Sequence, residues 1–157
     1  LRTSFVDGAR PADYRTIDTG AADLDAERAA IDAWIDAGPG GALDLAVLGL
    51  GVNGHLGMNE PGSPVDGRTA RVDLAASTIA GAQRYFEGRA APTWGVTVGL
   101  ADLLAAREVW VLATGRGKSE IVARATEGPA TTDVPASLVQ FHPNVTWWLD
   151  PAAAEGS

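Results

Sequence analysis

The stretch that decides the fold runs from Leu43 to Pro64 and reads Leu-Asp-Leu-Ala-Val-Leu-Gly-Leu-Gly-Val-Asn-Gly-His-Leu-Gly-Met-Asn-Glu-Pro-Gly-Ser-Pro. Its first part, Leu43–Leu48, is a short apolar run closed by a glycine, which predicts a buried strand of a parallel sheet. A glycine-rich loop follows, and glycine is used where backbone turns sharply or approaches a ligand closely. Ligands of open α/β sheets bind beyond the carboxyl ends of the strands. The polar side chains of this loop are therefore predicted to face a ligand, and they are Asn53, His55 and Glu60.

Strand and helix patterns alternate along the rest of the chain. Asp23 is predicted to cap a helix that ends at the next glycine cluster. Further strands are predicted over residues 69–74, 94–98, 108–114 and 145–149, and further helices over 77–86, 100–106, 119–127 and 135–141. Ser77 or Thr78 is expected to cap the helix after the second strand, Arg15–Ile17 to form a short strand, and the residues after Pro151 to form a frayed tail. The alternation predicts a single α/β domain over residues 1–157 with a mainly parallel sheet.

Composition bounds the class of protein. The chain has 157 residues, a net charge of −8 and no cysteine. The acidic balance offers no basic stripe to a nucleic acid, and the lack of cysteine excludes disulfides and a thiolate zinc site. No apolar run approaches the ~20 residues that cross a bilayer, so we expect a soluble, cytoplasmic protein without a membrane partner. The chain opens without an initiator methionine, as expected either of a trimmed N-terminus or of the C-terminal part of a longer protein.

Two glycine-rich segments resemble nucleotide-binding motifs, and each lacks a feature that its motif requires. Gly49–Gly54 has the spacing G-x-G-x-x-G, but glycines and a proline interrupt the long helix that must follow in a dinucleotide fold. Gly115–Ser119 resembles the end of a P-loop, but Leu112 stands where that motif needs its first glycine. The second segment still opens a helix with Lys118, which is a site for one phosphate or carboxylate. On the local sequence alone, a solvated lysine after an ordinary turn is the simpler interpretation.

The two histidines are interpreted differently. His55 can carry a proton near neutral pH, and Glu60 can orient it and raise its pKa. Asn53 can hydrogen-bond the ring or the ligand. A histidine that only satisfies backbone groups of the loop is an equal alternative. His142 is predicted at a helix end, where a structural role is favoured.

The loop as a whole resembles a known signature. The signature of glucosamine-6-phosphate deaminases and isomerases is similar to the segment Gly51-Val-Asn-Gly-His-Leu-Gly-Met-Asn-Glu-Pro-Gly-Ser. Four later segments resemble the same family in the same order, and they are Thr97–Leu100, Ala106–Val109, Ala113–Lys118 and Pro135–Leu138. The resemblance covers nearly the whole chain. It implies a Rossmann-like, three-layer α/β fold whose N-terminal strands lie outside this sequence.

The resemblance implies an enzyme that converts a 2-amino-2-deoxyhexose 6-phosphate and water into a ketohexose 6-phosphate and ammonia. It implies neither a redox cofactor nor a metal. By position, His55 corresponds to the residue that moves the proton during ring opening, and Glu60 to its carboxylate partner, with Asn53 as the third residue of the catalytic group.

The same resemblance implies a binding site for a small sugar phosphate. Arg84 and Lys118 correspond to the residues that hold the phosphate. Gly51 and Gly54 are further predicted substrate-binding residues, because glycine lets backbone approach a ligand closely. An assembly of identical subunits is compatible with this interpretation.

The chain departs from the family pattern in several places. The commoner pattern has aspartate at Asn53, and asparagine supplies no charge to an imidazolium; the asparagine form is associated with galactosamine-6-phosphate relatives. Ala70 and Val72 stand where some relatives carry allosteric basic residues. The enolising aspartate and first phosphate loop of the family lie nearer the N-terminus than this chain reaches, so we expect a C-terminal portion that is inactive alone. A 6-phosphogluconolactonase and a non-catalytic sugar-phosphate-binding module are the alternatives.

Overall fold

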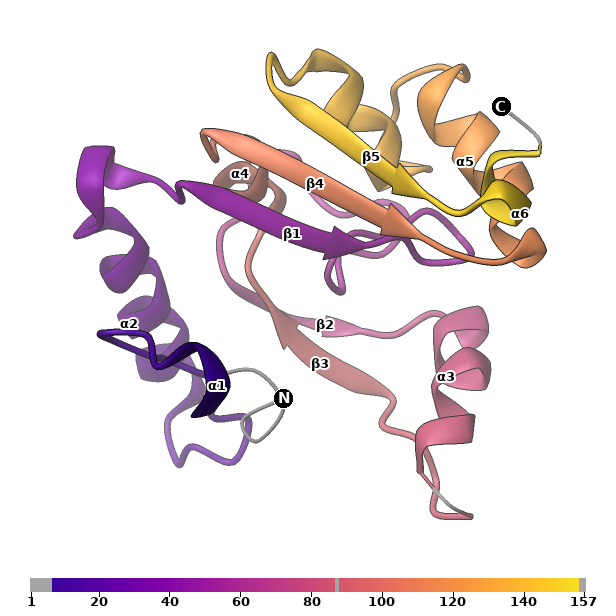
Figure 1. Ribbon diagram of the computed structural model, residues 1–157. Coiled ribbons are helices and arrows are strands. Elements are labelled where there is room, and N and C mark those ends of the chain that lie inside the picture. The colour runs from indigo at the N-terminus through magenta and orange to yellow at the C-terminus, as the bar shows by residue number, and fades with distance from the viewer. Residues whose placement is uncertain (1–6, 87, 156–157) are drawn as a thin grey trace.

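The computed structural model describes residues 7–86 and 88–155, and it has the predicted α/β character (Figure 1). In chain order the helices and strands are α1 (Asp7–Ala9), α2 (Leu24–Asp36), β1 (Leu45–Gly49), β2 (Ala70–Asp73), α3 (Ala76–Ala82), β3 (Trp94–Thr97), α4 (Leu100–Leu104), β4 (Glu108–Ala113), α5 (Ser119–Thr126), β5 (Val145–Leu149) and α6 (Pro151–Ala154). Short 3₁₀ segments join them, and they are η2 (Pro39–Gly41), η3 (Gln83–Tyr85), η4 (Arg116–Lys118) and η5 (Pro135–Phe141).

Three of the strands form a parallel sheet in the order β1-β4-β5. Leu45 pairs with Glu108 across the first ladder, and Val109 pairs with Val145 across the second. The strands predicted at Leu43–Leu48 and 108–114 are thus confirmed and lie side by side in parallel, so the loops that follow them leave the sheet at the same edge. The strands β2 and β3 form a separate antiparallel pair below this sheet in Figure 1, which the alternation of strands and helices did not predict.

One face of the parallel sheet carries the hydrophobic core. Ala46, Leu48, Val109 and Val111 are buried on this face. Side chains from α5 and η5 belong to the same buried cluster, and they are Ile121, Val122, Ala125, Ala136 and Val139. The apolar stripe of α5 explains why this helix packs on the sheet, since residues three and four apart share one face of a helix.

The other face of the sheet is apolar and exposed. Leu45, Val47 and Leu112 alternate with the buried residues of β1 and β4, and these three side chains and Trp148 of β5 are each at least 39% exposed. The prediction that β1 is a buried strand is therefore correct for only one of its faces. Parallel sheets are normally covered on both faces, so this surface has the character of an interior one.

The N-terminal segment differs from its prediction. Residues Arg15–Ile17 form no strand. Instead, the carboxylate of Glu27 on α2 pairs with Arg15 at 3.3 Å and accepts a hydrogen bond from the backbone N–H of Asp18 at 3.0 Å. These contacts hold the segment along the helix. The predicted cap of that helix is confirmed, because Asp23 accepts a hydrogen bond from the third backbone N–H after it at 2.9 Å.

Two further predictions are wrong for identifiable reasons. The helix α3 begins after Ala75, so Ser77 and Thr78 lie inside it rather than capping it. The backbone N–H of Ala75 instead donates to the carboxylate of Glu60 at 3.3 Å, which supplies part of the missing cap from the loop after β1. The C-terminal tail is helical as α6, capped by Asp150 and packed through a fully buried alanine.

Candidate active site

The loop after β1 folds back on itself and presents His55. Leu50 and Leu56 form an antiparallel bridge, and the backbone N–H of Gly51 donates to the carbonyl of His55 at 3.0 Å. Leu56 is fully buried beneath the loop. The side-chain amide of Asn59 donates to two backbone carbonyls at 2.9–3.0 Å. The loop is therefore held by its own hydrogen bonds and by its core contact.

Two glycines of the loop allow close packing. The imidazole of His55 lies directly over Gly51, where an added Cβ would be 2.4 Å from the ring atoms Cε1 and Nδ1. Gly54 has a φ of 86°, and an added Cβ would lie 2.7 Å from a methyl of Val134. Gly51 lines the cavity described below, and Gly54 is not among its lining residues. The substrate-binding roles predicted for both glycines stay predictions.

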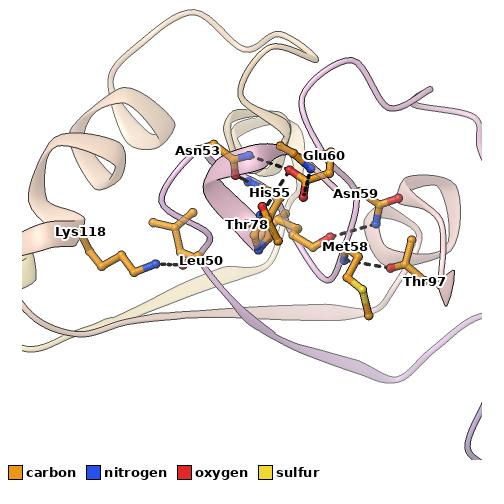
Figure 2. Close-up of polar contacts among 11 residues, drawn as sticks. Leu50, Asn53, His55, Met58, Asn59, Glu60, Thr78, Thr97 and Lys118 are labelled. Carbon is orange, nitrogen blue, oxygen red and sulfur yellow. Dashed lines mark hydrogen bonds and ion pairs between the residues drawn. The ribbon is translucent and has the colours of Figure 1, made fainter. Parts of the chain in front are cut away.

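The loop after β4 meets the loop after β1. Gly115 has a φ of 87°, and its backbone N–H is held by the carboxylate of Asp150 at 2.9 and 3.0 Å. Three residues on, Lys118 is half-buried, and its Nζ donates to the carbonyl of Leu50 at 2.5 Å (Figure 2). The interpretation of Lys118 as a solvated surface lysine is thus wrong, because the parallel pairing of β1 with β4 brings this turn against the histidine loop.

The surroundings of His55 favour the neutral form of its imidazole at pH 7. Its Nδ1 lies 3.2 Å from the hydroxyl of Thr78 and 3.6 Å from Oε2 of Glu60 (Figure 2). Burial lowers the pKa of His55 below its ordinary 6.5; Glu60 acts in the opposite direction, and the nearby Lys118 lowers the pKa further. Glu60 does raise the pKa of His55, as the sequence predicts, but the desolvation of the ring lowers this pKa by more.

Glu60 is ionised although it is buried. Desolvation opposes the charge, but hydrogen bonds from Thr78, from Asn53 and from the backbone of Ala75 together hold the pKa of Glu60 below its ordinary value. The carboxylate accepts from Asn53 at 2.6 Å and from the backbone of Ala75 at 3.3 Å, and a carboxylate with two or three donors is strongly stabilised in its charged form. A buried acceptor thus lies beside a neutral imidazole.

Asn53 contacts Glu60 rather than the imidazole. Its Nδ2 donates to Oε2 of Glu60 at 2.6 Å, and its Oδ1 accepts from the backbone N–H of His55 at 3.3 Å. Of the two partners considered for Asn53, the ring is not hydrogen-bonded to it within the described residues, and a contact with the ligand stays a prediction. An aspartate at this position would place a second carboxylate 2.6 Å from Glu60, and one of the two would need a proton. The amide instead supplies a donor, which keeps Glu60 charged.

A cavity of about 420 Å³ lies between the two loops and α3. It is lined by His55, Lys118 and Arg84 together with Ser77, Thr78 and Tyr85. Burial and the neighbouring Arg84 lower the pKa of Lys118. Neither cation pairs with a carboxylate within the part of the chain that the structure describes. Two converging, unneutralised cations in one cavity are suited to a ligand with a doubly charged anionic group.

Comparison with protein families identifies the fold family. A model of the family described as glucosamine-6-phosphate isomerases/6-phosphogluconolactonase matches residues 1–148. The chain belongs to this family. A glucosamine-6-phosphate deaminase from Rhodopirellula baltica is 44% identical over 149 residues, which cover 86% of this chain and 59% of that protein. One from Pediococcus pentosaceus is 41% identical, over 93% of this chain and 61% of that protein. The chain thus spans about three fifths of the length of these relatives.

Solved structures agree with the family assignment. A monomeric glucosamine-6-phosphate deaminase superposes with a TM-score of 0.83 at 33% identity, over 90% of this chain and 58% of that one. A 6-phosphogluconolactonase from Trypanosoma brucei superposes with a TM-score of 0.62 at 24% identity, which shows the shared fold alone. The Rossmann-like fold expected of the family is confirmed.

The structure of this family member adds residues that its sequence did not reveal. Thr78 is 23 positions from His55, and only the placement of α3 brings the two side chains together. No periodicity or motif signals such a contact. By contrast, His142 has the structural role that its sequence predicts: its buried ring lies 2.7 Å from the carbonyl of Ala106 and accepts from the backbone N–H of Asn144 at 3.0 Å.

The described residues offer neither a cluster of metal ligands nor a membrane-spanning helix. Within residues 7–86 and 88–155, no three acidic, histidine or cysteine side chains cluster in a way that could hold a metal ion. The helices of the same described ranges include none that is long and apolar enough to traverse a bilayer.

Proposed function

We propose that this chain supplies the ring-opening and phosphate-binding groups of a cytoplasmic deaminase/isomerase that acts on a 2-amino-2-deoxyhexose 6-phosphate. The observation that carries the proposal is one cavity lined by a neutral His55 and by two cations that pair with no carboxylate of the described residues, with the ionised Glu60 at 3.6 Å from the imidazole. The moderate identity to curated glucosamine-6-phosphate deaminases supports the same class of substrate.

The chemistry of the substrate explains why these groups belong together. A pyranose must open before the proton on its C2 becomes acidic. Opening needs a base for the anomeric hydroxyl and an acid for the ring oxygen, and one imidazole can serve as both in turn. A histidine that is neutral at pH 7 is ready for the first of these steps. Arg84 provides a planar fork and Lys118 a point charge for the phosphate at the far end of the sugar.

The exposed sheet face and the coverage of the relatives support a second part of the proposal. Residues 1–157 form a single α/β domain that is the C-terminal portion of the complete enzyme. The face that carries Leu45, Val47, Leu112 and Trp148 is then covered by the remaining portion. The base that removes the C2 proton belongs to that portion.

Product analysis of the full-length protein tests the proposed reaction. We expect release of ammonia and a ketohexose 6-phosphate from glucosamine 6-phosphate or galactosamine 6-phosphate, each assayed separately. Hydrolysis of 6-phosphogluconolactone without ammonia release would instead establish the lactonase alternative. Binding of the sugar phosphates without any turnover would establish the binding-module alternative.

Lys118 gives a sharper test of the phosphate site. Replacing Lys118 by alanine should raise KM for the sugar phosphate about 10- to 100-fold, the usual cost of a lost charged hydrogen bond, with a smaller effect on kcat. The acid limb of kcat/KM should also move to higher pH, because Lys118 lowers the pKa of His55. Replacing Arg124, an exposed residue of α5 outside the cavity, provides the control and should change neither quantity. An unchanged KM in K118A would contradict the assignment.

A further inference from the structure

Thr78 occupies a position between the two groups whose cooperation the proposed function requires. Its Oγ1 is 3.2 Å from Nδ1 of His55, whereas the carboxylate of Glu60 is 3.6 Å from the same nitrogen. Only the hydroxyl is therefore within ordinary hydrogen-bonding distance of the ring. Thr78 is also among the groups that lower the pKa of Glu60, whose carboxylate accepts a hydrogen bond from Asn53 at 2.6 Å. Figure 2 shows the three side chains converging from α3 and from the loop after β1.

The donors and acceptors that each side chain carries decide which group donates in these contacts. A hydroxyl has one proton to donate, and an ionised carboxylate can only accept. The carboxylate of Glu60 lies 3.6 Å from Nδ1 of His55, and its negative charge stabilises a proton on that nitrogen. The hydroxyl of Thr78, at 3.2 Å, can then accept from Nδ1–H through a lone pair.

We propose that Thr78 is a positioning residue for His55, in a role that rests on the proposed function. Its hydroxyl accepts from Nδ1–H next to the carboxylate of Glu60, which holds the neutral imidazole in the tautomer with an unprotonated Nε2. Within the described residues, no protein group is hydrogen-bonded to that Nε2. Nε2 is therefore the atom that takes the proton of the anomeric hydroxyl and returns it to the ring oxygen, so the histidine ends the step neutral.

His142 provides a built-in reference with the opposite tautomer. Its Nδ1 accepts from the backbone of Asn144, so its proton lies on Nε2 and points to the carbonyl of Ala106. The two histidines of this chain are thus predicted to differ in which nitrogen carries the proton. The difference is measurable, because protonated and unprotonated imidazole nitrogens have widely separated nitrogen-15 chemical shifts.

Nitrogen-15 NMR of the histidine-labelled full-length protein, without substrate, tests the tautomer directly. The signals of His55 are assigned by their loss in H55Q, and those of His142 by their loss in H142Q. At neutral pH we expect Nδ1–H for His55 and Nε2–H for His142. In T78V, which keeps the shape of the side chain but removes the hydroxyl, the Nε2–H form of His55 should increase. An Nε2–H form of His55 in the wild-type protein, or an unchanged tautomer in T78V, would overturn the proposal.

Kinetics of two matched variants then test the positioning role. T78V should lower kcat about 3- to 10-fold, the effect of one lost hydrogen bond, with little change in KM for the sugar phosphate. T78S retains the hydroxyl and should stay close to the wild-type kcat. Equal impairment of T78S and T78V, or a wild-type kcat in T78V, would show that Thr78 only packs. If the wild-type protein lacks deaminase activity, the proposed function fails, while the NMR result still decides the tautomer.

Discussion

Replacing His55 by glutamine in the full-length enzyme should lower turnover by about 10²–10⁴-fold, the usual range for a lost general acid–base. Glutamine is similar in size and can hydrogen-bond, but it cannot exchange a proton near neutral pH. Binding of a ring-opened amino-alditol 6-phosphate should survive, because the cations that hold its phosphate lie on other elements. Steady-state kinetics and calorimetric titration of the analogue measure the two quantities separately.

The pH dependence of kcat/KM tests the same assignment, because the direction in which its acid limb should move can be stated for each variant. The active form has a neutral His55, so kcat/KM should be level near neutrality and fall only below the ordinary pKa of 6.5. Replacing Glu60 by glutamine removes an interaction that raises this pKa, so the acid limb should move to still lower pH. E60Q should also reduce turnover less than H55Q does, since the base itself remains.

The alternative role of His55 as a purely structural residue has its own signature. In that case H55Q would lose turnover, analogue binding and thermal stability together. H142Q provides the matched comparison, because His142 is buried, hydrogen-bonded to backbone and not part of the cavity lining. We expect H142Q to lower the melting temperature while the folded fraction keeps its turnover. The catalytic assignment would be contradicted if H55Q lost turnover, analogue binding and thermal stability together, or if it lost only stability and kept turnover as H142Q does.

Much of the fold is predictable because it depends on local patterns. The apolar runs of β1 and β4, and the glycines that end them, predict neighbouring strands with polar loops at one sheet edge. The cap at Asp23 depends only on residues within one helical turn. The loop residues His55 and Glu60 are similarly identifiable, since both belong to one short segment that carries unusual chemistry.

The remaining features depend on tertiary placement, and no local pattern encodes them. The backbone N–H of Ala75 at the start of α3 is held by Glu60, which is 15 positions away, so the nearby hydroxyls do not mark where this helix begins. The pKa of His55 depends on how deeply the ring is buried, and the sequence does not reveal that burial. The two-stranded antiparallel sheet and the contact of Thr78 with His55 likewise require the chain to be folded.

Replacing Gly51 by alanine should reduce turnover on the order of 10²-fold, although it removes no functional group. The φ of Gly51 is not in the left-handed region, so alanine introduces no backbone strain. Its Cβ, however, would lie 2.4 Å from Cε1 and Nδ1 of His55, which is far inside van der Waals contact. The ring must move by about an ångström, and misplacement of a catalytic group by that distance has an effect of this size.

Gly117→Ala is the matched control for this prediction. Gly117 also has an ordinary φ, it lies in the loop after β4, and an added Cβ there meets nothing within 4 Å. G117A should keep nearly wild-type turnover, which excludes a general effect of stiffening the glycine-rich loops. In G51A the phosphate contacts are untouched, so the ring-opened analogue should still bind while kcat falls. Turnover in G51A equal to that of G117A would show that the position of the imidazole over Gly51 is not required for catalysis.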